Sequence, residues 1–527
     1  MWKQNKIWKD AEWKKRIVRA GILGILPLVL CVIYCAAYGG TIGDVYVPNS
    51  YWNDELLYYK QVEGILKSGV PGGYFGYNES RAPVLSFAVW SPVLMAPWVI
   101  WGKVFGWNTF APFLCNLVCL MGGMFTFGYL ARPTQKQLAT IVVLLSLFTP
   151  LTRFIMSCMP EIFCCALLLW YMGCLFAYGS EKKEGYLWQM IVIAGILTLM
   201  RPYFLLFLLY PAAAGWKHGK VKCMAMAGTG GLFLVGYLMI SRFLSAAYLI
   251  DVVETSVVRA FVDQGLGAGL MELWQKCIQS VLDLKVFLRV ALQYGNFSGS
   301  MYAIYGTMGV MLLVIAAAEW KNRKKESVFR LALSTAIVYA AMMAAICFMY
   351  VMNDGGRHLL TFLLVGILVT GMYSARIVDK IVQIVIGLVL CLFFFVKPGI
   401  EYDRLPPLRQ EELAEDIESM GEILREKMEY TPGIGWENTV IWLSYDMVDG
   451  EVAAEPWQQL YALPGGFGVN LCSLDYVLEH MDTLQSRYIA AVPGGQVEEE
   501  LLKRGAGLIA ENGQIAVYQY ETQAVIQ

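Results

Sequence analysis

The stretch YWNDELLYY, residues 51–59, follows the first apolar run that is long enough to cross a membrane, residues 17–38. Two adjacent carboxylates, Asp54 and Glu55, open a predicted helix over residues 55–67. Acids held at a lipid boundary can act on a substrate with a lipid tail. They can also cap the helix, because a carboxylate accepts hydrogen bonds from the free N–H groups of a first turn and suits the helix dipole.

The composition is that of a membrane protein. Of the 527 residues, 57% are hydrophobic and 16% are charged, and the mean hydropathy is +0.51. Soluble proteins have about a quarter of their residues charged. No basic tract has the length of a nucleic-acid-binding segment, so no nucleic-acid partner is expected. The 13 Cys lie almost all in apolar runs, where packing is the expected role rather than disulfide or metal chemistry.

The basic residues predict how the chain is oriented. Six Lys and Arg precede the first apolar run and Arg19 lies near its start, which places the N-terminus in the cytoplasm and the loop at 39–108 outside. Residues 83–105 are apolar enough to cross but contain Pro92, Pro97 and three Trp. If they crossed, the later Lys and Arg clusters would all lie outside. We therefore predict an interfacial helix there that does not cross.

About eleven spans are then expected within a transmembrane module at residues 1–397. They are predicted at residues 17–38, 109–131, 137–151, 161–179, 187–201, 203–216, 223–243, 302–319, 329–351, 358–375 and 377–396. Several are near the lower limit of about 17–20 residues for a spanning helix. The odd number places the C-terminus outside, on the side of Asp54. In the external loop at 244–301, residues 270–292 are typical of an amphipathic helix on the membrane surface.

From residue 398 the composition becomes that of a soluble domain, residues 398–527. An acidic amphipathic helix is predicted at 408–430. Strands are predicted at 439–444, 488–492 and 514–520, and further helices at 474–481 and 497–503. Asp446 and Asp449 are interpreted as a turn, because their spacing fits no EF-hand. The expected fold class is a polytopic α-helical membrane protein with a small extracytoplasmic α/β domain at the C-terminus.

The layout resembles the GT-C superfamily. The resemblance rests on the acid pair Asp54–Glu55, the Gly- and Pro-rich loop that follows at 69–77, the interfacial helix and the C-terminal domain. GT-C proteins are membrane glycosyltransferases that use polyprenyl-phosphate-linked sugars, and they include protein O-mannosyltransferases and lipid A aminoarabinose transferases. The resemblance implies an inverting enzyme that moves a sugar from such a donor to a glycan, lipid or protein acceptor at the outer face of the membrane.

The same resemblance assigns the acids. Asp54 matches the first-loop acid that activates the acceptor, since a carboxylate within hydrogen-bond reach can take or orient a hydroxyl or amine proton. Glu55 and Glu161 are the supporting acids. Glu161 lies where a span begins. An ionisable side chain at that depth in the membrane costs free energy, so it usually has a function. It can also serve as the first-turn acid of the helix after Pro160.

The donor phosphate needs positive charge. The first choice is Arg357 with His358, in a charged loop between two spans on the side of Asp54, because an Arg fork matches a phosphate. Arg357 can also be a snorkelling side chain that anchors a helix end. Further candidates lie at an external helix end or beside the acid-bearing loops: Arg201, Arg81 and Arg153. Some relatives bind a divalent cation near these acids, and the metal question stays open.

Two other classes of function stay open. One is a transporter or flippase of lipid-linked glycans, and the other is a non-catalytic membrane protein that binds cell-envelope polymer. A transporter is expected to have charges inside its spans and inverted repeats, and the sequence has neither. The chain also has no nucleotide-binding motif, as expected of an enzyme whose donor is a lipid phosphate. The sequence does not identify the sugar, the acceptor, the lipid length or the oligomeric state.

Overall fold

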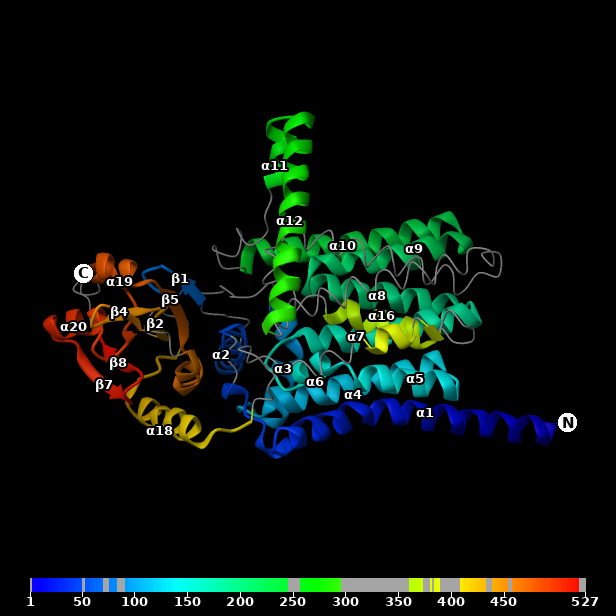
Figure 1. Cartoon of the computed structure of the whole chain (residues 1–527), viewed down its shortest axis with the longest axis horizontal. Helices are drawn as coiled ribbons and strands as arrows, with labels where there is room; N and C mark the ends of the chain where they lie inside the picture. The colour runs from blue at the N-terminus through cyan, green and yellow to red at the C-terminus, as the bar shows by residue number, and fades with distance from the viewer. Residues whose placement is uncertain are drawn as a thin grey trace.

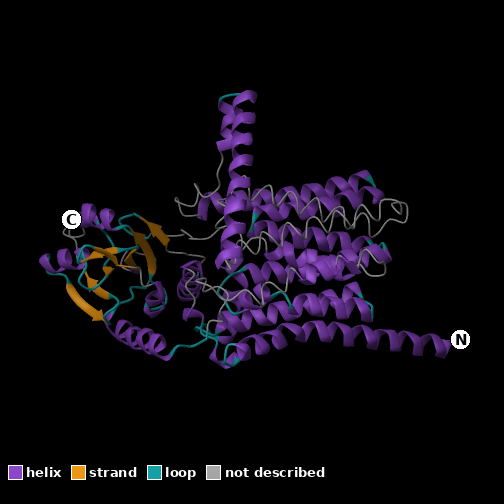
Figure 2. Cartoon of the chain, viewed as in Figure 1, coloured by secondary structure: helices purple, strands orange, loops and turns teal. Residues whose placement is uncertain are grey.

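The chain forms a bundle of long helices with a β-sheet at one end and the N-terminus at the other (Figure 1). Figure 2 shows that strands are confined to the sheet end. The computed structural model describes residues 2–49, 53–69, 75–82, 91–244, 256–294, 360–372, 380–381, 383–388, 408–432, 438–453 and 457–520. The bundle is a helical membrane assembly, as its long apolar helices indicate.

The bundle is built around one central helix. Its long members are α1 (Trp2–Ala37), α4 (Ala111–Ala131), α7 (Glu161–Glu181), α8 (Glu184–Met200), α10 (Lys220–Leu244) and α16 (Leu360–Met372). α4 packs between α1 and α7. A Cβ on Gly123 would lie 2.8 Å from the Cα of Ala166, and one on Gly128 would lie 2.9 Å from the Cα of Ala20. Glycine therefore lets the three backbones approach closely, as is common between membrane helices.

The span prediction holds for the longest helices. Among the described residues, four helices are long and apolar enough to cross a membrane: Glu12–Ala37, Ala111–Ala131, Glu161–Glu181 and Lys220–Leu244. The single span predicted at 137–151 is instead α5 (Gln135–Ser146) and α6 (Thr149–Ile155), bent by 69° at a break. Pro150 lies in the first turn of α6, where a missing N–H costs nothing, so a new helix begins there.

The region at 203–216 also differs from the prediction of one span. It forms the 3₁₀ helix η4 (Pro202–Leu208), the short helix α9 (Leu209–Gly215) and the 3₁₀ turn η5 (Trp216–His218). The spans expected at 302–319 and 329–351 lie outside the described residues, as does most of the one at 377–396. The total of eleven spans stays a prediction.

The first loop returns across the sheet end of the bundle. Its elements are η1 (Ile42–Asp44), η2 (Val47–Asn49), α2 (Asn53–Ser68), β1 (Phe75–Tyr77), η3 (Pro92–Met95) and α3 (Ala96–Phe105). The helix predicted at 55–67 is α2. Of the predicted interfacial segment at 83–105, the described part has four residues in η3 and ten in α3. That part alone is shorter than the roughly 20 residues that a crossing helix needs.

The loop at 244–301 contains a helical hairpin, α11 (Ser256–Asp263) and α12 (Leu266–Tyr294). Gly265 joins the two helices with φ +88°, a value that favours glycine. α12 includes the predicted helix at 270–292. The hairpin stands out across the direction of the bundle helices (Figure 1). Exposed apolar side chains follow one face of α12 at every fourth residue, namely Leu266, Leu270, Trp274, Ile278 and Leu282.

The sheet has six strands in the order β1-β5-β2-β6-β8-β7. Its C-terminal strands are β2 (Thr439–Leu443), β5 (Gly468–Cys472), β6 (Tyr488–Ala491), β7 (Gly507–Glu511) and β8 (Ala516–Gln519). The four neighbouring strands β1, β5, β2 and β6 run parallel to one another. β8 is antiparallel to β6, and β7 is antiparallel to β8. β2, β5 and β6 are buried along their whole length, as central parallel strands usually are.

Short helices surround the sheet. They are α18 (Glu411–Lys427), η11 (Trp457–Ala462), α19 (Leu474–His480), η12 (Met481–Thr483) and α20 (Gln496–Lys503). The turn predicted at Asp446 and Asp449 is a hairpin of β3 (Asp446–Val448) and β4 (Glu451–Ala453), with Asp449 at φ 51° and Gly450 at φ 81°. Asp-Gly with two positive φ angles is the favoured two-residue hairpin turn. We call the sheet, with β1 and these helices and strands, the sheet domain.

One edge strand of the sheet domain comes from the first loop. β1 pairs in parallel with β5, with Phe75 opposite Val469 and Tyr77 opposite Leu471. The sheet is therefore not built from the C-terminal residues alone, as the boundary predicted at residue 398 implied. A three-residue strand carries no periodic signal in the sequence, and its partner is far away in the chain.

Candidate active site

A buried ion pair joins two of the predicted site residues. Glu161 is the first residue of α7, and Arg201 follows the last residue of α8. The Nη2 atom of Arg201 donates to Oε1 of Glu161 at 2.6 Å, and both side chains are at most 2% exposed. α7 and α8 are consecutive helices joined by a tight turn at Lys182 and Lys183, so the start of one lies beside the end of the other.

The pair has further polar neighbours. Nη1 of Arg201 donates to the hydroxyl of Tyr203 at 3.1 Å. The other carboxylate oxygen of Glu161, Oε2, is buried and has no hydrogen-bond partner among the described residues. A buried acceptor without a partner costs about 1–3 kcal/mol. Such an atom is therefore a natural acceptor for a hydroxyl group of a bound substrate.

A buried asparagine fixes the loop that leads to Glu161. Asn116, in the middle of α4, donates to the carbonyl of Ser157 at 2.6 Å and to that of Ile155 at 3.2 Å. Its own oxygen accepts from Nε1 of Trp98 on α3 at 3.0 Å. Asn116 thus joins α3, α4 and the loop between α6 and α7. These bonds hold the loop at Ser157, four residues before Glu161.

The first turn of α2 lies beside this loop. Glu55 is fully buried and interacts electrostatically with Cys158, which precedes Glu161 by three residues. Asp54 is half-buried. Tyr58 comes one helical turn after Asp54 and therefore shares its face of the helix. It interacts electrostatically with Arg201.

Aromatic packing supports the same arrangement. The ring of Tyr58 meets that of Trp98 at 6.1 Å, and Trp98 meets Phe163 of α7 at 4.9 Å, both edge to face. α2, α3 and α7 are thereby packed together at the sheet end of the bundle (Figure 1). Tyr58, one turn after Asp54, therefore lies on a side of α2 that faces Arg201.

The other predicted basic residues are placed differently. Arg153 is buried in α6, at the start of the loop that Asn116 fixes. Arg81 is exposed and follows Ser80, whose carbonyl accepts from the backbone N–H groups of Gln485 and Ser486, so it lies against the sheet domain. Arg357 and His358 lie outside the described residues.

Two polar residues of this region were absent from the sequence prediction. Asn116 could have been found from the sequence, because a polar side chain in the middle of an apolar span costs free energy and usually has a hydrogen-bond partner. Lys60 on α2 could not, since a buried and an exposed lysine look alike in a sequence. It is 5% exposed and pairs with Glu63 at 2.7 Å.

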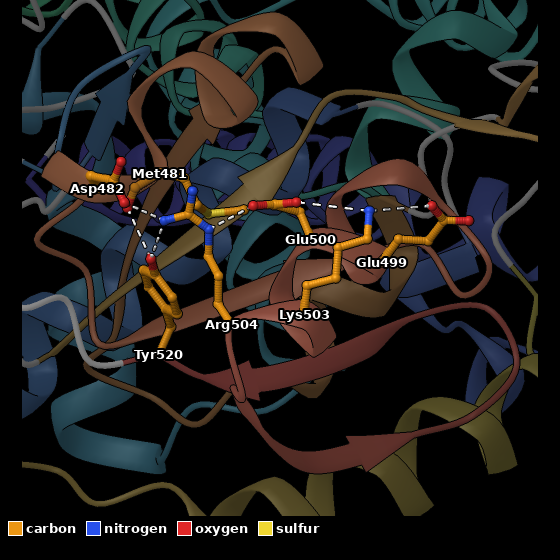
Figure 3. Close-up of polar contacts among 7 residues, drawn as sticks. All are labelled: Met481, Asp482, Glu499, Glu500, Lys503, Arg504 and Tyr520. Atoms are coloured by element: carbon orange, nitrogen blue, oxygen red, sulfur yellow. Dashed lines mark hydrogen bonds and ion pairs between the residues drawn. The ribbon is translucent and has the colours of Figure 1, made fainter.

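The sheet domain carries a second charged cluster, which is exposed, unlike the buried Glu161–Arg201 pair. Arg504 donates from Nε to Glu500 at 2.7 Å and from Nη1 to Asp482, and it lies near Tyr520 (Figure 3). Asp482 is 83% exposed. Exposed pairs of this sort contribute about 0–1 kcal/mol. The cluster joins α20, η12 and the end of β8, and it has no buried acid that could serve chemistry.

No metal site is complete in the part of the chain that the structure describes. Within that part, no three His, Cys, Asp or Glu side chains converge as metal ligands would. Glu161 is already paired with Arg201. The described donors therefore do not by themselves fit a divalent cation.

Comparison with known proteins gives structural neighbours only. No family model matches the chain, and no curated protein matches its sequence. The apo oligosaccharyltransferase of Archaeoglobus fulgidus has a TM-score of 0.49 and 11% identity over 90% of this chain and 69% of that one. The oligosaccharyltransferase AglB from Archaeoglobus fulgidus, in complex with an inhibitory peptide and a dolichol-phosphate, has a TM-score of 0.48 and 10% identity over 97% of this chain and 75% of that one.

ArnT from Cupriavidus metallidurans bound to undecaprenyl phosphate has a TM-score of 0.43 and 11% identity, over 94% of this chain and 97% of that one. The oligosaccharyltransferase and ArnT are GT-C glycosyltransferases, the superfamily that the sequence resembles. At these TM-scores a functional assignment depends on the residues of the site themselves.

Proposed function

We propose that the protein is an inverting membrane glycosyltransferase that moves one sugar from a polyprenyl-phosphate donor to an acceptor at the outer face of the membrane. One observation carries this proposal: Tyr58, one helical turn after Asp54 on α2, interacts with Arg201 of the buried Glu161–Arg201 pair, at one end of an apolar bundle. Carboxylates and guanidinium groups together at a lipid boundary suit the transfer of a sugar from a lipid phosphate.

The reaction is a single displacement. An acceptor hydroxyl or amine attacks the anomeric carbon, the bond to the donor phosphate oxygen breaks, and the configuration inverts. Asp54 takes the acceptor proton, because it lies half-buried on the face of α2 that points towards Arg201. The lipid phosphate leaves as a stable anion and needs cations rather than a strong acid.

The remaining residues have supporting roles. Glu161, oriented by Arg201, presents Oε2 to a hydroxyl of the donor sugar or of the acceptor. Arg201 and Arg153 add positive charge near the loop before α7. The proposed phosphate clamp is Arg357 with His358. Glu55, buried beside Cys158, supports the position of Asp54.

The charges at the other end of the bundle support a cytoplasmic N-terminus. Arg19 donates to the carbonyl of Pro133 at 2.9 Å, after α4. Lys183 pairs with Glu181 at 2.7 Å, and Lys222 pairs with Glu184 at 2.5 Å. These basic residues gather at the end away from the sheet, as the positive-inside rule expects of cytoplasmic loops. The site and the sheet domain are then extracytoplasmic.

The test is turnover of a lipid-linked donor. Purified protein is incubated with a panel of radiolabelled polyprenyl-phosphate sugars, and release of the carrier is followed. We expect Asp54→Asn and Glu161→Gln to lower kcat at least 100-fold while the donor still binds. Glu181→Gln is the matched control, because Glu181 ends the helix that Glu161 begins. If wild type releases no carrier from any donor, but translocates lipid-linked glycan equally well with and without Asp54→Asn, the protein is instead a flippase.

A further inference from the structure

The face of α2 opposite the site is held by the sheet domain through Lys60. The ammonium group of Lys60 donates to the backbone carbonyls of Leu463 and of Tyr461, the latter at 3.4 Å, and pairs with Oε2 of Glu63 at 2.7 Å. The side chain is only 4% exposed. A buried lysine is tolerated only when its charge and its three N–H donors have partners. Here three acceptors provide them, and two are carbonyls of the sheet domain.

The chain of the sheet domain lies unusually close to α2 at this point. A Cβ on Gly466, which has φ +103°, would lie 2.8 Å from the ring of Tyr430 and 2.9 Å from Lys67. A Cβ on Gly465 would lie 3.5 Å from Glu63. Glycine at 466 therefore allows the close approach to α2, whereas a Cβ at 465 would make only ordinary van der Waals contact. We call these contacts, between Lys60 and Glu63 of α2 and residues 461–466, the α2 seam.

Apolar contacts continue the seam. The ring of Tyr59 lies 5.0 Å from that of Tyr461 in the sheet domain and is stacked on Trp107 at 5.2 Å. Leu57 and Phe467 line the same small cavity beside Lys60. Both belong to a single apolar core that runs from the bundle through α2 to one face of the sheet. No polar layer separates the helix from the sheet domain at these residues.

The segment after α2 is attached as well. The N–H of Asn78 donates to the carbonyl of Leu471 at 2.9 Å, and the N–H of Ser473 donates to the side chain of Asn78 at 2.8 Å. Gln485 donates to the carbonyl of Ser80 at 2.8 Å. α2 is therefore held at its middle by the seam and beyond its C-terminal end by β1 and the residues that follow it.

The two faces of α2 have separate tasks. Tyr58, which interacts with Arg201, and Lys60 are two residues apart, so at about 100° per residue their directions differ by roughly 160°. One face meets the site in the bundle, and the opposite face is bonded to the sheet domain. Any shift of the sheet domain against the bundle must therefore move Asp54 relative to Glu161.

We propose that the sheet domain sets the position of Asp54. Lys60 is the positioning residue, because it bonds α2, the helix that carries Asp54, to the sheet domain. This rests on the proposed function, because Asp54 is the acid that the proposed reaction uses. Lys60 is assigned no contact with donor or acceptor, because its ammonium group is bonded to Glu63 and to two carbonyls of the sheet domain. Its loss should affect the chemical step, for which Asp54 must be aligned, and leave the binding of the lipid phosphate nearly unchanged.

The test compares Lys60→Met with Lys67→Met in the full-length protein. Lys67 lies two turns further along α2, beside the seam, and its side chain is exposed. We expect Lys60→Met to lower kcat at least tenfold with less than a threefold change in KM for the donor, and Lys67→Met to stay within twofold of wild type. Equal kcat in the two variants, or a parallel loss of donor binding in Lys60→Met, would overturn the proposal.

A second variant perturbs the seam from the domain side, in case Lys60→Met does not fold. Gly466→Ala places a Cβ against Tyr430 and Lys67, whereas Gly513→Ala also replaces a glycine of positive φ but has nothing within 4 Å. The same selective loss of kcat is expected in Gly466→Ala alone. Unchanged kcat there would contradict the proposal.

Hydrogen–deuterium exchange separates this inference from the proposed function. Residues 53–68 should exchange at least tenfold faster in Lys60→Met and in Gly466→Ala than in their controls, whether or not turnover is found. If wild type turns over no lipid-linked donor but exchange rises as expected, the proposed function fails and the seam stands. If turnover is found but exchange in α2 is unchanged, the seam proposal fails alone.

Discussion

Removal of Arg201 should be far more damaging than removal of the whole Glu161–Arg201 pair. In Arg201→Met, the carboxylate of Glu161 would lose its ion-pair partner, although it is 2% exposed and its Oε2 already has no hydrogen-bond partner among the described residues. Breaking a buried pair by removing one member costs about 3–5 kcal/mol. Replacing both members by apolar residues of similar size is often neutral. We therefore expect Arg201→Met to lose about 3–5 kcal/mol and Glu161→Leu/Arg201→Met to regain most of it.

The assay is unfolding of the purified protein in detergent, by denaturant or heat, for wild type, the two single variants and the double variant. Turnover is measured on the same preparations. A double variant that is stable and inactive would separate the structural role of the pair from its role in catalysis. If the losses in the single variants simply add in the double variant, the pair is not a coupled buried unit. If the double variant is active, Glu161 takes no part in the reaction.

Three further predictions follow from contacts away from the pair. Asn116→Leu leaves the carbonyls of Ser157 and Ile155 without their donor, so we expect a loss of about 1–3 kcal/mol in unfolding and a lower kcat; Thr140→Val, on exposed helix surface, should change neither. Gly123→Leu forces α4 away from the backbone at Ala166, and a loss of about 1–3 kcal/mol or more is expected by the same measurement. Burial raises the pKa of Glu79 above its ordinary 4.5, so its contribution to stability is full below pH 4.5 and is lost as pH rises through the raised pKa. The Tm of Glu79→Gln should then exceed that of wild type at neutral pH, and the difference should vanish near pH 4; an equal gap at both pH values would contradict this.

The elements that local pattern determines were predicted well. The helix that carries Asp54 and Glu55 and the strands β2, β6 and β8 lie close to their predicted positions, because each has its own apolar pattern. β5 was missed because Asn470 interrupts its apolar run. In the structure Asn470 is fully buried, and its side chain donates to the carbonyl of Glu79, so a contact with the first loop provides what the sequence pattern lacks.

The site residues were predicted singly, and their pairing was not. Glu161 and Arg201 were proposed as an acid and a phosphate-binding cation for separate reasons. Their ion pair depends on the antiparallel placement of α7 and α8, which the short link at Lys182 and Lys183 produces. The role proposed for each side chain stays a prediction. Lys60 shows the limit of the sequence most clearly, since Lys67 lies on the same face of the same helix and is exposed.

The shared core explains why the first loop and the C-terminal residues depend on each other. α2 buries Leu56, Tyr59 and Val62 in a core that also contains Phe467 and Val469. Each fully buried side chain of this kind contributes about 1.5–3 kcal/mol. A helix of 16 residues has little stability alone in water, so α2 takes its fixed form from both neighbours. The acid that the proposed chemistry requires therefore lies on a helix that neither the bundle nor the sheet domain could hold in place by itself.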